Sequence, residues 1–137
     1  MKHALSIFLV LLVIITLNCM PDDDRPPDVL DSINRTGWTY TQPDGNSTLA
    51  FGSSNVCTIT QPIYNGEWTS SIIIDGTFVV IEGTFEYNQP NVSIKFTGEC
   101  TNEEFLFSSC NVSGSMSGNI LTISSGGKEF EFKFGIK

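Results

Sequence analysis

The sequence predicts an all-β domain in which about eight to ten antiparallel strands follow one another as a meander and close into an up-and-down barrel. Three observations lead to this prediction. Apolar and polar residues alternate in several segments, most clearly at 92–97 and 129–136, as they do in strands with one dry and one wet face. No stretch after residue 36 has the period of a helix. Turn-forming residues divide the rest of the chain into short segments.

Residues 1–18 have the layout of a secretory signal peptide. A cationic start at Lys2 precedes an apolar run over residues 4–17. This run is shorter than the ~18 to 20 apolar residues that a transmembrane helix needs. Pro21 and three aspartates follow directly, which weighs against an uncleaved membrane helix.

The residues Thr16-Leu17-Asn18 before Cys19 resemble the lipobox of bacterial lipoproteins, in which the signal is removed and the cysteine is acylated. The resemblance implies a lipid on Cys19. Two or more acyl chains hold a protein stably, since each buried methylene contributes ~0.8 kcal/mol. We therefore expect a lipid-anchored protein of the cell envelope, located at the outer membrane on either its periplasmic or its external face.

Residues 19–36 are expected to be the acylated cysteine followed by an acidic, proline-rich tether. Charge and proline without apolar periodicity cannot build a core, so this stretch predicts an extended spacer. Acidic residues close behind an acylated cysteine also resemble the surface-export signal of lipoproteins from Bacteroides-type bacteria. A plain solvated linker is the alternative.

Residues 37–137 are expected to form the barrel domain. Apolar residues two apart indicate strands around 38–40, 49–51, 57–59, 92–96 and 130–136. Turn signals separate the strands at 43–45, 52–54, 65–66, 75–76, 88–90, 117–119 and 126–127. A β-sandwich of Greek-key topology is the alternative. It needs a long crossing connection, and the connections in this sequence are all expected to be short, which favours sequential hairpins and a barrel.

Four motifs span most of this domain: Gly37-Trp38-x-Tyr40, Leu49-x-Phe51, Gly83-Thr84-Phe85-x-Tyr87-x-x-Pro90-x-Val92, and Gly114-x-x-x-Gly118-Asn119-x-Leu121-Thr122. With them the chain resembles the small lipocalin-like lipoproteins of Bacteroides-type bacteria. The resemblance implies a lipocalin-like barrel in which the early tryptophan seals one end. It implies no established activity.

The charge and the histidine content restrict the function. Removal of the signal would take away Lys2, leaving 6 Lys and Arg (7 − 1) against 15 Asp and Glu, a balance of −9. Such a surface is a poor partner for nucleic acid. The one histidine, His3, lies in the signal, so Ser-His-Asp and Cys-His catalysis are excluded from the mature chain. The chain also lacks Cys-x-x-Cys spacing and phosphate-binding glycine motifs, so we expect no metal site, no cofactor and no enzymatic activity.

Paired carboxylates are the one enzymatic arrangement left to consider. Glu82 and Glu86 lie four apart on one expected strand, and therefore on one face, at a separation that a glycosidase could use. Phe85 and Tyr87 occupy the opposite face. We expect the aromatic rings to lie in the core and the two glutamates to face water.

Three cysteines remain once Cys19 is acylated, so at most one disulfide can form. Cys100 and Cys110 bracket an expected hairpin tip and are the favoured pair. Cys57 shares its face with Ile59 and is expected to be a small buried residue.

Aromatic residues offer two interpretations of the barrel interior. They could line a cavity for an apolar ligand. They could instead fill the core, since small barrels have little interior to spare, and this is the favoured interpretation. The residues in question are Trp38, Tyr40, Phe51, Phe85, Tyr87, Phe96, Phe130, Phe132 and Phe134.

Two functions follow as hypotheses. The favoured one is a non-catalytic interaction module that meets a protein or a glycan through its loops or its outer face, with an exposed apolar patch near Tyr64 and Trp68. The alternative is a lipocalin-like carrier of a small hydrophobic ligand, which requires a cavity open at one end of the barrel.

Overall fold

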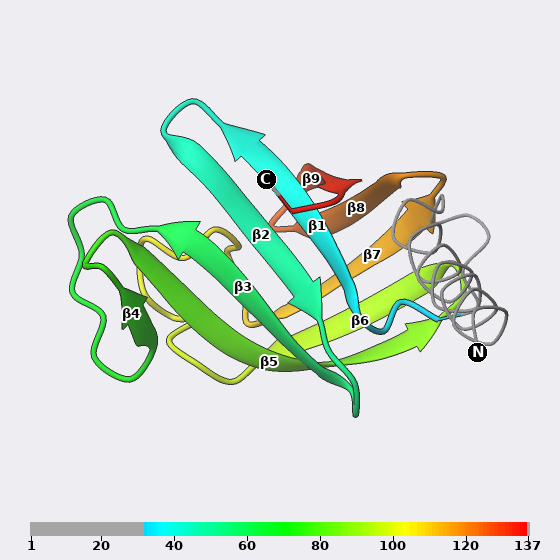
Figure 1. Cartoon of the computed structure of the whole chain (residues 1–137), viewed down its shortest axis with the longest axis horizontal. Helices are drawn as coiled ribbons and strands as arrows, with labels where there is room; N and C mark the ends of the chain where they lie inside the picture. The colour runs from blue at the N-terminus through cyan, green and yellow to red at the C-terminus, as the bar shows by residue number, and fades with distance from the viewer. Residues whose placement is uncertain (1–31, 137) are drawn as a thin grey trace, which may run out of the picture.

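The computed structural model describes residues 32–136, which form nine antiparallel strands and no helix (Figure 1). The predicted signal peptide, Cys19 and the tether as far as residue 31 lie outside the described residues. Within the described range, no helix could span a membrane. The strands are β1 (Thr36–Gln42), β2 (Gly45–Phe51), β3 (Val56–Pro62), β4 (Ile72–Ile74), β5 (Phe78–Asn88), β6 (Asn91–Phe96), β7 (Asn111–Ser117), β8 (Ile120–Ser125) and β9 (Lys128–Phe134).

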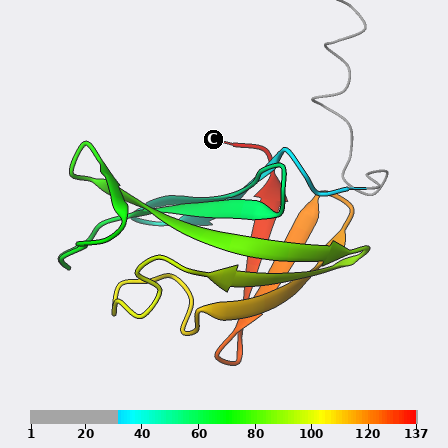
Figure 2. The same ribbon diagram turned by 90° about the horizontal axis from the view of Figure 1, so that it is seen from below.

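Eight of these strands, β1–β3 and β5–β9, close into an up-and-down barrel. Each pairs with the next in sequence, β3 pairs with β5 from Val56↔Thr84 to Pro62↔Phe78, and β9 pairs with β1. The predicted all-β, lipocalin-like meander barrel is thus confirmed, and the sandwich alternative is wrong. The seam between β1 and β9 is short, with two paired positions, Trp38↔Phe134 and Thr39↔Lys133. Figure 2 shows β9 (red) rising at a steep angle to β1–β3 and meeting them near its C-terminal end.

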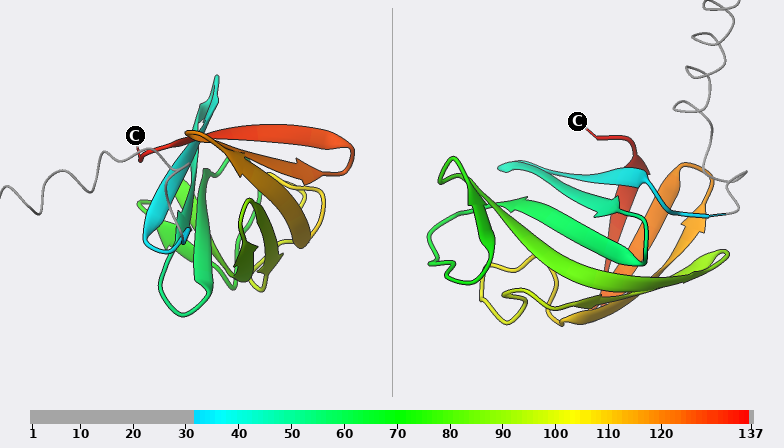
Figure 3. Two further views of the ribbon diagram at one scale, coloured as in Figure 1. Left: turned by 90° about the vertical axis from the view of Figure 1, so that its right-hand side faces the viewer. Right: turned by 60° about the horizontal axis from the view of Figure 1, so that its bottom comes forward.

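Successive connections of the meander alternate between the two ends of the barrel. One end, here called the loop end, carries residues 43–44, 63–71, 75–77, 97–110 and 126–127. The other, here called the N-terminal end, carries residues 52–55, 89–90 and 118–119 together with the first described residues. Figure 3 shows β4 and the first described residues at opposite ends of the molecule.

Several tight turns form where the sequence predicts them. Asp75 and Gly76 have φ angles of 50° and 68°, and Gly126 and Gly127 have φ angles of 59° and 78°. Two consecutive residues with positive φ are what a type I′ hairpin turn requires, and Asp-Gly and Gly-Gly pairs supply them at low steric cost.

The expectation that all connections are short is wrong at two places, both at the loop end. Residues 63–71 separate β3 from β4, and residues 97–110 separate β6 from β7. The second of these is also not the hairpin tip expected between the two cysteines, because it folds as an irregular loop. The barrel still forms, since β3 and β5 become neighbours without needing a tight turn between them.

The core fills the barrel and extends beyond the predicted domain boundary. Side chains alternate between buried and exposed along β5 and β6, as the sequence pattern predicts. Trp38 is fully buried, and its indole N–H donates to Thr36 Oγ1 at 2.9 Å, while the Thr36 hydroxyl donates to the Ile33 carbonyl at 2.6 Å. Ile33 is itself fully buried, so the folded domain begins before the expected boundary at Gly37.

Candidate functional site at the loop end

The long connection over residues 97–110 closes the loop end of the barrel with aromatic rings. Phe105 and Phe107 are buried. The Phe107 ring centroid lies 5.2 Å from that of Phe130 and 5.8 Å from that of Phe96, and the Phe105 centroid lies 5.2 Å from that of Phe96. The loop therefore acts as a plug that adds its own aromatic residues to the core.

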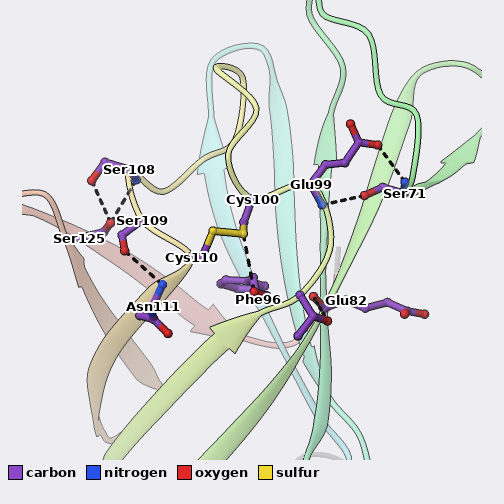
Figure 4. Close-up of a disulfide and its surroundings, with 11 residues drawn as sticks. Ser71, Glu82, Phe96, Glu99, Cys100, Ser108, Ser109, Cys110, Asn111 and Ser125 are labelled. Carbon is purple, nitrogen blue, oxygen red and sulfur yellow. Dashed lines mark hydrogen bonds between the residues drawn. A yellow bond between two sulfur atoms is a disulfide. The ribbon is translucent and has the colours of Figure 1, made fainter.

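A disulfide between Cys100 and Cys110, the pair favoured by the sequence, closes this plug at its base (Figure 4). Their Cα atoms are 5.2 Å apart. The Phe96 N–H also donates to the Cys110 carbonyl at 2.8 Å, and this hydrogen bond joins the end of β6 to the residue just before β7. The plug is thus a covalently closed unit.

The side chain of Gln61 attaches the plug to the barrel wall. Gln61 lies on β3 and is 2% exposed. Its amide nitrogen donates to the Glu104 carbonyl at 2.7 Å, and its amide oxygen accepts from the Leu106 N–H at 2.9 Å. A buried side-chain amide needs partners for both its donor and its acceptor, and the plug's backbone supplies both.

The carboxylate of Glu104 joins the plug to the neighbouring connection 63–71. It accepts hydrogen bonds from the backbone N–H groups of Tyr64, at 3.0 Å, and of Asn65 and Gly66. Partial burial alone would raise the pKa of Glu104. These three bonds, helped by the Trp68 side chain, outweigh that effect and hold the pKa below its ordinary value.

Glu99 makes a second link of the same kind. Its carboxylate accepts from the backbone N–H groups of Ser70 and, at 2.9 Å, of Ser71, the two residues before β4 (Figure 4). Burial tends to raise the pKa of Glu99. The hydrogen bonds from the backbone of residues 69–71 have the larger effect, so the pKa of Glu99 lies below the ordinary glutamate value. Two ionised carboxylates therefore bind the two long connections into one surface.

A hollow of about 1150 Å³ opens beside the plug, between β1 and β9. Tyr40 and Phe130 line it from the two strands, and Phe105, Leu106 and Phe107 line it from the plug. It lies on the loop-end side of the short β1–β9 seam. It is the feature of the described structure closest to an open barrel mouth.

The nine aromatic residues proposed from sequence fall into different environments. Tyr40 and Phe130 reach the hollow at the loop end, whereas Phe85 is buried in the core with its ring centroid 4.9 Å from that of Phe51. Trp38, Phe51, Phe96 and Phe132 are buried in the core, and Tyr87 and Phe134 are partly buried against it. Most of the set therefore packs against other side chains.

An exposed apolar patch lies on the loop end. It consists of Tyr64, Ile72, Ile73, Ile74 and Phe78, which are 37% to 56% exposed. All three residues of β4 belong to it. The sequence placed such a patch near Tyr64, which is correct. Its second proposed member, Trp68, is wrong because that side chain is buried.

Negative charge surrounds this apolar patch. The connections of the loop end carry Asp44, Glu67, Asp75, Glu99, Glu103 and Glu104, and they contain no lysine or arginine. Asp44 and Glu104 lie close enough to Tyr64 to help raise the pKa of its hydroxyl, after the larger effect of burial. The loop end therefore combines exposed apolar residues with an acidic rim.

The remaining predictions about reactive residues concern the barrel wall. Glu82 and Glu86 are exposed while Phe85 is buried, as predicted. Cys57 is buried, and burial raises the pKa of its thiol to about 12, which keeps it protonated and unreactive at neutral pH. Among residues 32–136 there is no group of three or more His, Cys, Asp and Glu side chains placed to hold a metal ion.

Sequence reasoning missed several residues that build the loop end: Gln61, Glu99, Phe105, Phe107 and the Ile72–Ile74 strand. The two-residue spacing of Phe105 and Phe107 between bonded cysteines is a usable signal for a plug. The run of three isoleucines is a usable signal for a strand, although a run without alternation does not say which faces are covered.

Comparison of the chain with models of protein families, with curated proteins and with solved structures finds no match.

Proposed function

We propose that this protein is a non-catalytic binding module of the cell envelope, held to a membrane by a lipid on Cys19, and that it binds its partner through the loop end. We also propose that it is related to the lipocalin-like lipoproteins of Bacteroides-type bacteria and that it is located at the outer membrane. The observation that carries the proposal is the exposed apolar patch of Tyr64, Ile72, Ile73, Ile74 and Phe78. Exposed apolar side chains gathered at one end of a domain are typical of interaction sites.

The position of the patch supports this function. The chain enters the described domain at the N-terminal end, and β4 lies at the other end (Figure 3). A domain attached through residues preceding Ser32 would keep the loop end accessible to a protein or a glycan. The two carboxylate links of Glu99 and Glu104 hold the connections next to the patch in a fixed shape, which lowers the entropic cost of binding.

Site-specific photo-cross-linking in the native cell envelope tests this proposal. A photoreactive residue at Ile73 should give a discrete cross-linked product in intact cells. The same residue at Val56 is the matched control, because Val56 is also an exposed β-branched residue on a strand but lies at the N-terminal end. Equal cross-linking from both positions, or none from Ile73, would contradict the proposal.

The carrier function is the second candidate, and the hollow beside the plug favours it. The hollow of about 1150 Å³ is large enough for a small molecule, and its lining combines the rings of Tyr40, Phe107 and Phe130 with polar side chains such as Glu103 and Lys128. Native mass spectrometry of the full chain, followed by solvent release, should then detect a co-purifying apolar compound. Leu106→Trp should reduce the amount carried by filling the hollow, while Leu106→Met should not. A protein that stays empty after isolation from its native envelope argues against the carrier.

A further inference from the structure

The free edge of β4 indicates how a partner would be held, an inference that rests on the function proposed above. β4 is the last strand in the sheet order and pairs with β5 alone, through Ile72↔Val80, Ile73↔Val79 and Ile74↔Phe78. The eight barrel strands form a closed ring. We propose that the outer edge of β4 takes up an extended, cationic segment of a partner protein as an additional β-strand.

The backbone of β4 is available for such pairing. Among residues 32–136, no strand lies against its second edge. The plug holds the chain just before this strand, through Glu99 and the N–H groups of Ser70 and Ser71, and these bonds end before Ile72. A row of unpaired N–H and C=O groups is a template for an incoming strand.

The side chains of β4 do not protect this edge in the usual way. Natural edge strands are commonly kept very short or blocked by lysine, proline or an inward-pointing charge; β4 is short, with three residues, but carries none of these side chains. β4 has three isoleucines instead, all of them exposed. Ile72 and Ile74 lie on one face of the strand and Ile73 on the other, so an added strand would find an apolar neighbour on both faces.

The charge around the edge selects the kind of partner. Asp75 follows β4 directly, and Glu67, Glu99 and Glu103 lie on the adjoining connections, which contain no basic residue. A second copy of this chain would bring the same negative charges to the interface and be repelled. A segment in which lysine or arginine alternates with apolar residues would complement both the acidic rim and the isoleucines.

A peptide titration with the full chain in detergent tests this inference. The probe is a blocked peptide of about six to eight residues, the length of a typical strand, alternating lysine and valine. The first control peptide has the same sequence with N-methyl groups on alternate residues, which removes the N–H donors of one edge and keeps the charge. The second replaces lysine with glutamate. Binding is followed by calorimetry and by the amide NMR signals of the protein.

We expect the lysine–valine peptide to bind and to shift and protect the amides of residues 72–74. The N-methylated and glutamate peptides should bind the wild-type protein at least about tenfold more weakly, a loss of ~1.4 kcal/mol or more in binding free energy. The lysine–valine peptide should bind the Ile73→Pro variant more weakly by a similar factor. Ile73→Thr keeps the β-branch and the N–H and should weaken binding less than Ile73→Pro does. Val56 pairs with Thr84 in the barrel wall, so a proline there would disturb the barrel itself. Val56→Thr is therefore the control at the N-terminal end, and it should leave peptide binding unchanged.

Three results would overturn the inference. One is tight binding that N-methylation leaves unchanged and that shifts residues 99–110 instead of 72–74; this would rule out strand addition while leaving the loop end as a binding surface. Another is the absence of binding by any cationic peptide, in which case the cross-linking from Ile73 still decides the proposed function separately. The third is a dimer that Ile73→Pro dissociates, which would identify a second copy as the occupant.

Discussion

The two ends of the barrel are built differently. At the N-terminal end the connections between strands are short, and Trp38 on β1 is fully buried and donates a hydrogen bond to Thr36. At the loop end two long connections cover the barrel. A disulfide, a buried glutamine and two glutamate carboxylates hold them in place.

This difference separates stability from binding. The closure at the N-terminal end belongs to the barrel itself, because its residues lie on or beside paired strands. The long connections of the loop end are held by contacts of their own, and not by the strand pairing of the barrel. The structure around β4 and the acidic rim can therefore change without a change in the barrel. Loss of these contacts should therefore affect the loop end before the barrel.

Trp38→Ala should have the largest effect on stability. Removing a fully buried indole leaves a cavity and costs about 3–5 kcal/mol of unfolding free energy. Phe107→Ala should cost less, because the plug can detach locally without opening the barrel. Urea denaturation of both variants measures the difference. If Phe107→Ala costs as much as Trp38→Ala, the plug is an integral part of the core and the separation of the two ends is wrong.

The Cys100→Ser/Cys110→Ser double variant should have the next largest effect. The bond closes a loop between residues separated by 10 positions, and the chain-entropy estimate for a loop of this size is about 2–3 kcal/mol. Hydrogen exchange should accelerate at Leu106 and remain slow at Ile59 in the barrel wall. Cys57→Ser is the control for removing a thiol from the barrel. Equal acceleration in both regions would show that the disulfide stabilises the whole domain.

Gln61→Leu should release the plug, because leucine fills a similar space in the barrel wall but cannot form hydrogen bonds to the plug. The Glu104 carbonyl and the Leu106 N–H would each lose a buried partner, which costs about 1–3 kcal/mol. Thr60→Leu, on the same strand but partly exposed, is the matched control. A Gln61→Leu variant as stable as the control, with unchanged exchange at Leu106, would contradict the role given to this side chain.

Acidification should loosen the link between the two long connections. The folded-state pKa of Glu104 lies below its ordinary value, so its stabilising effect is complete above the unfolded-state pKa of ~4.3 and is lost as the pH falls through the lower folded value. The amide proton shifts of Asn65 and Gly66 should report this transition. Glu104→Gln should remove it, and Glu103→Gln, on an exposed neighbour, should not. A midpoint at or above ~4.3 would contradict the assignment.

Local sequence patterns were enough to predict much of the barrel wall. The alternation at 92–96 and 130–136 predicted both strands and the burial of Phe130 and Phe132, although β9 ends at Phe134 and Ile136 is exposed; Asp75-Gly76 and Gly126-Gly127 predicted turns that form. The favoured cysteine pair is bonded. These features depend on neighbours within a few positions, and such neighbours are visible in a sequence.

The loop end was predicted poorly because its contacts join distant parts of the chain. Gln61 and Glu104 form hydrogen bonds to backbone groups about 40 positions away, and no local pattern identifies polar residues that form such long-range bonds. The prediction that Trp68 is exposed was wrong because it lies between strands, where no local periodicity marks a residue as buried. The strand at Ile72–Ile74 was not predicted, because a run without alternation reveals neither its pairing with β5 nor its unpaired second edge.

Local periodicity, turn residues and composition are enough to establish the all-β class, the meander and the acidic character, and they predict the signal and the lipid anchor. Strand periodicity and charge are properties of short segments, so they survive in any fold the chain could adopt. The tertiary structure decided where the barrel closes, that Phe105 and Phe107 plug it, and that β4 lies outside the closed ring. It also decided that Gly83 must lack a side chain, because a Cβ there would lie 2.8 Å from the Lys95 carbonyl oxygen of the neighbouring strand. These outcomes depend on which distant segments share the limited interior of one small barrel.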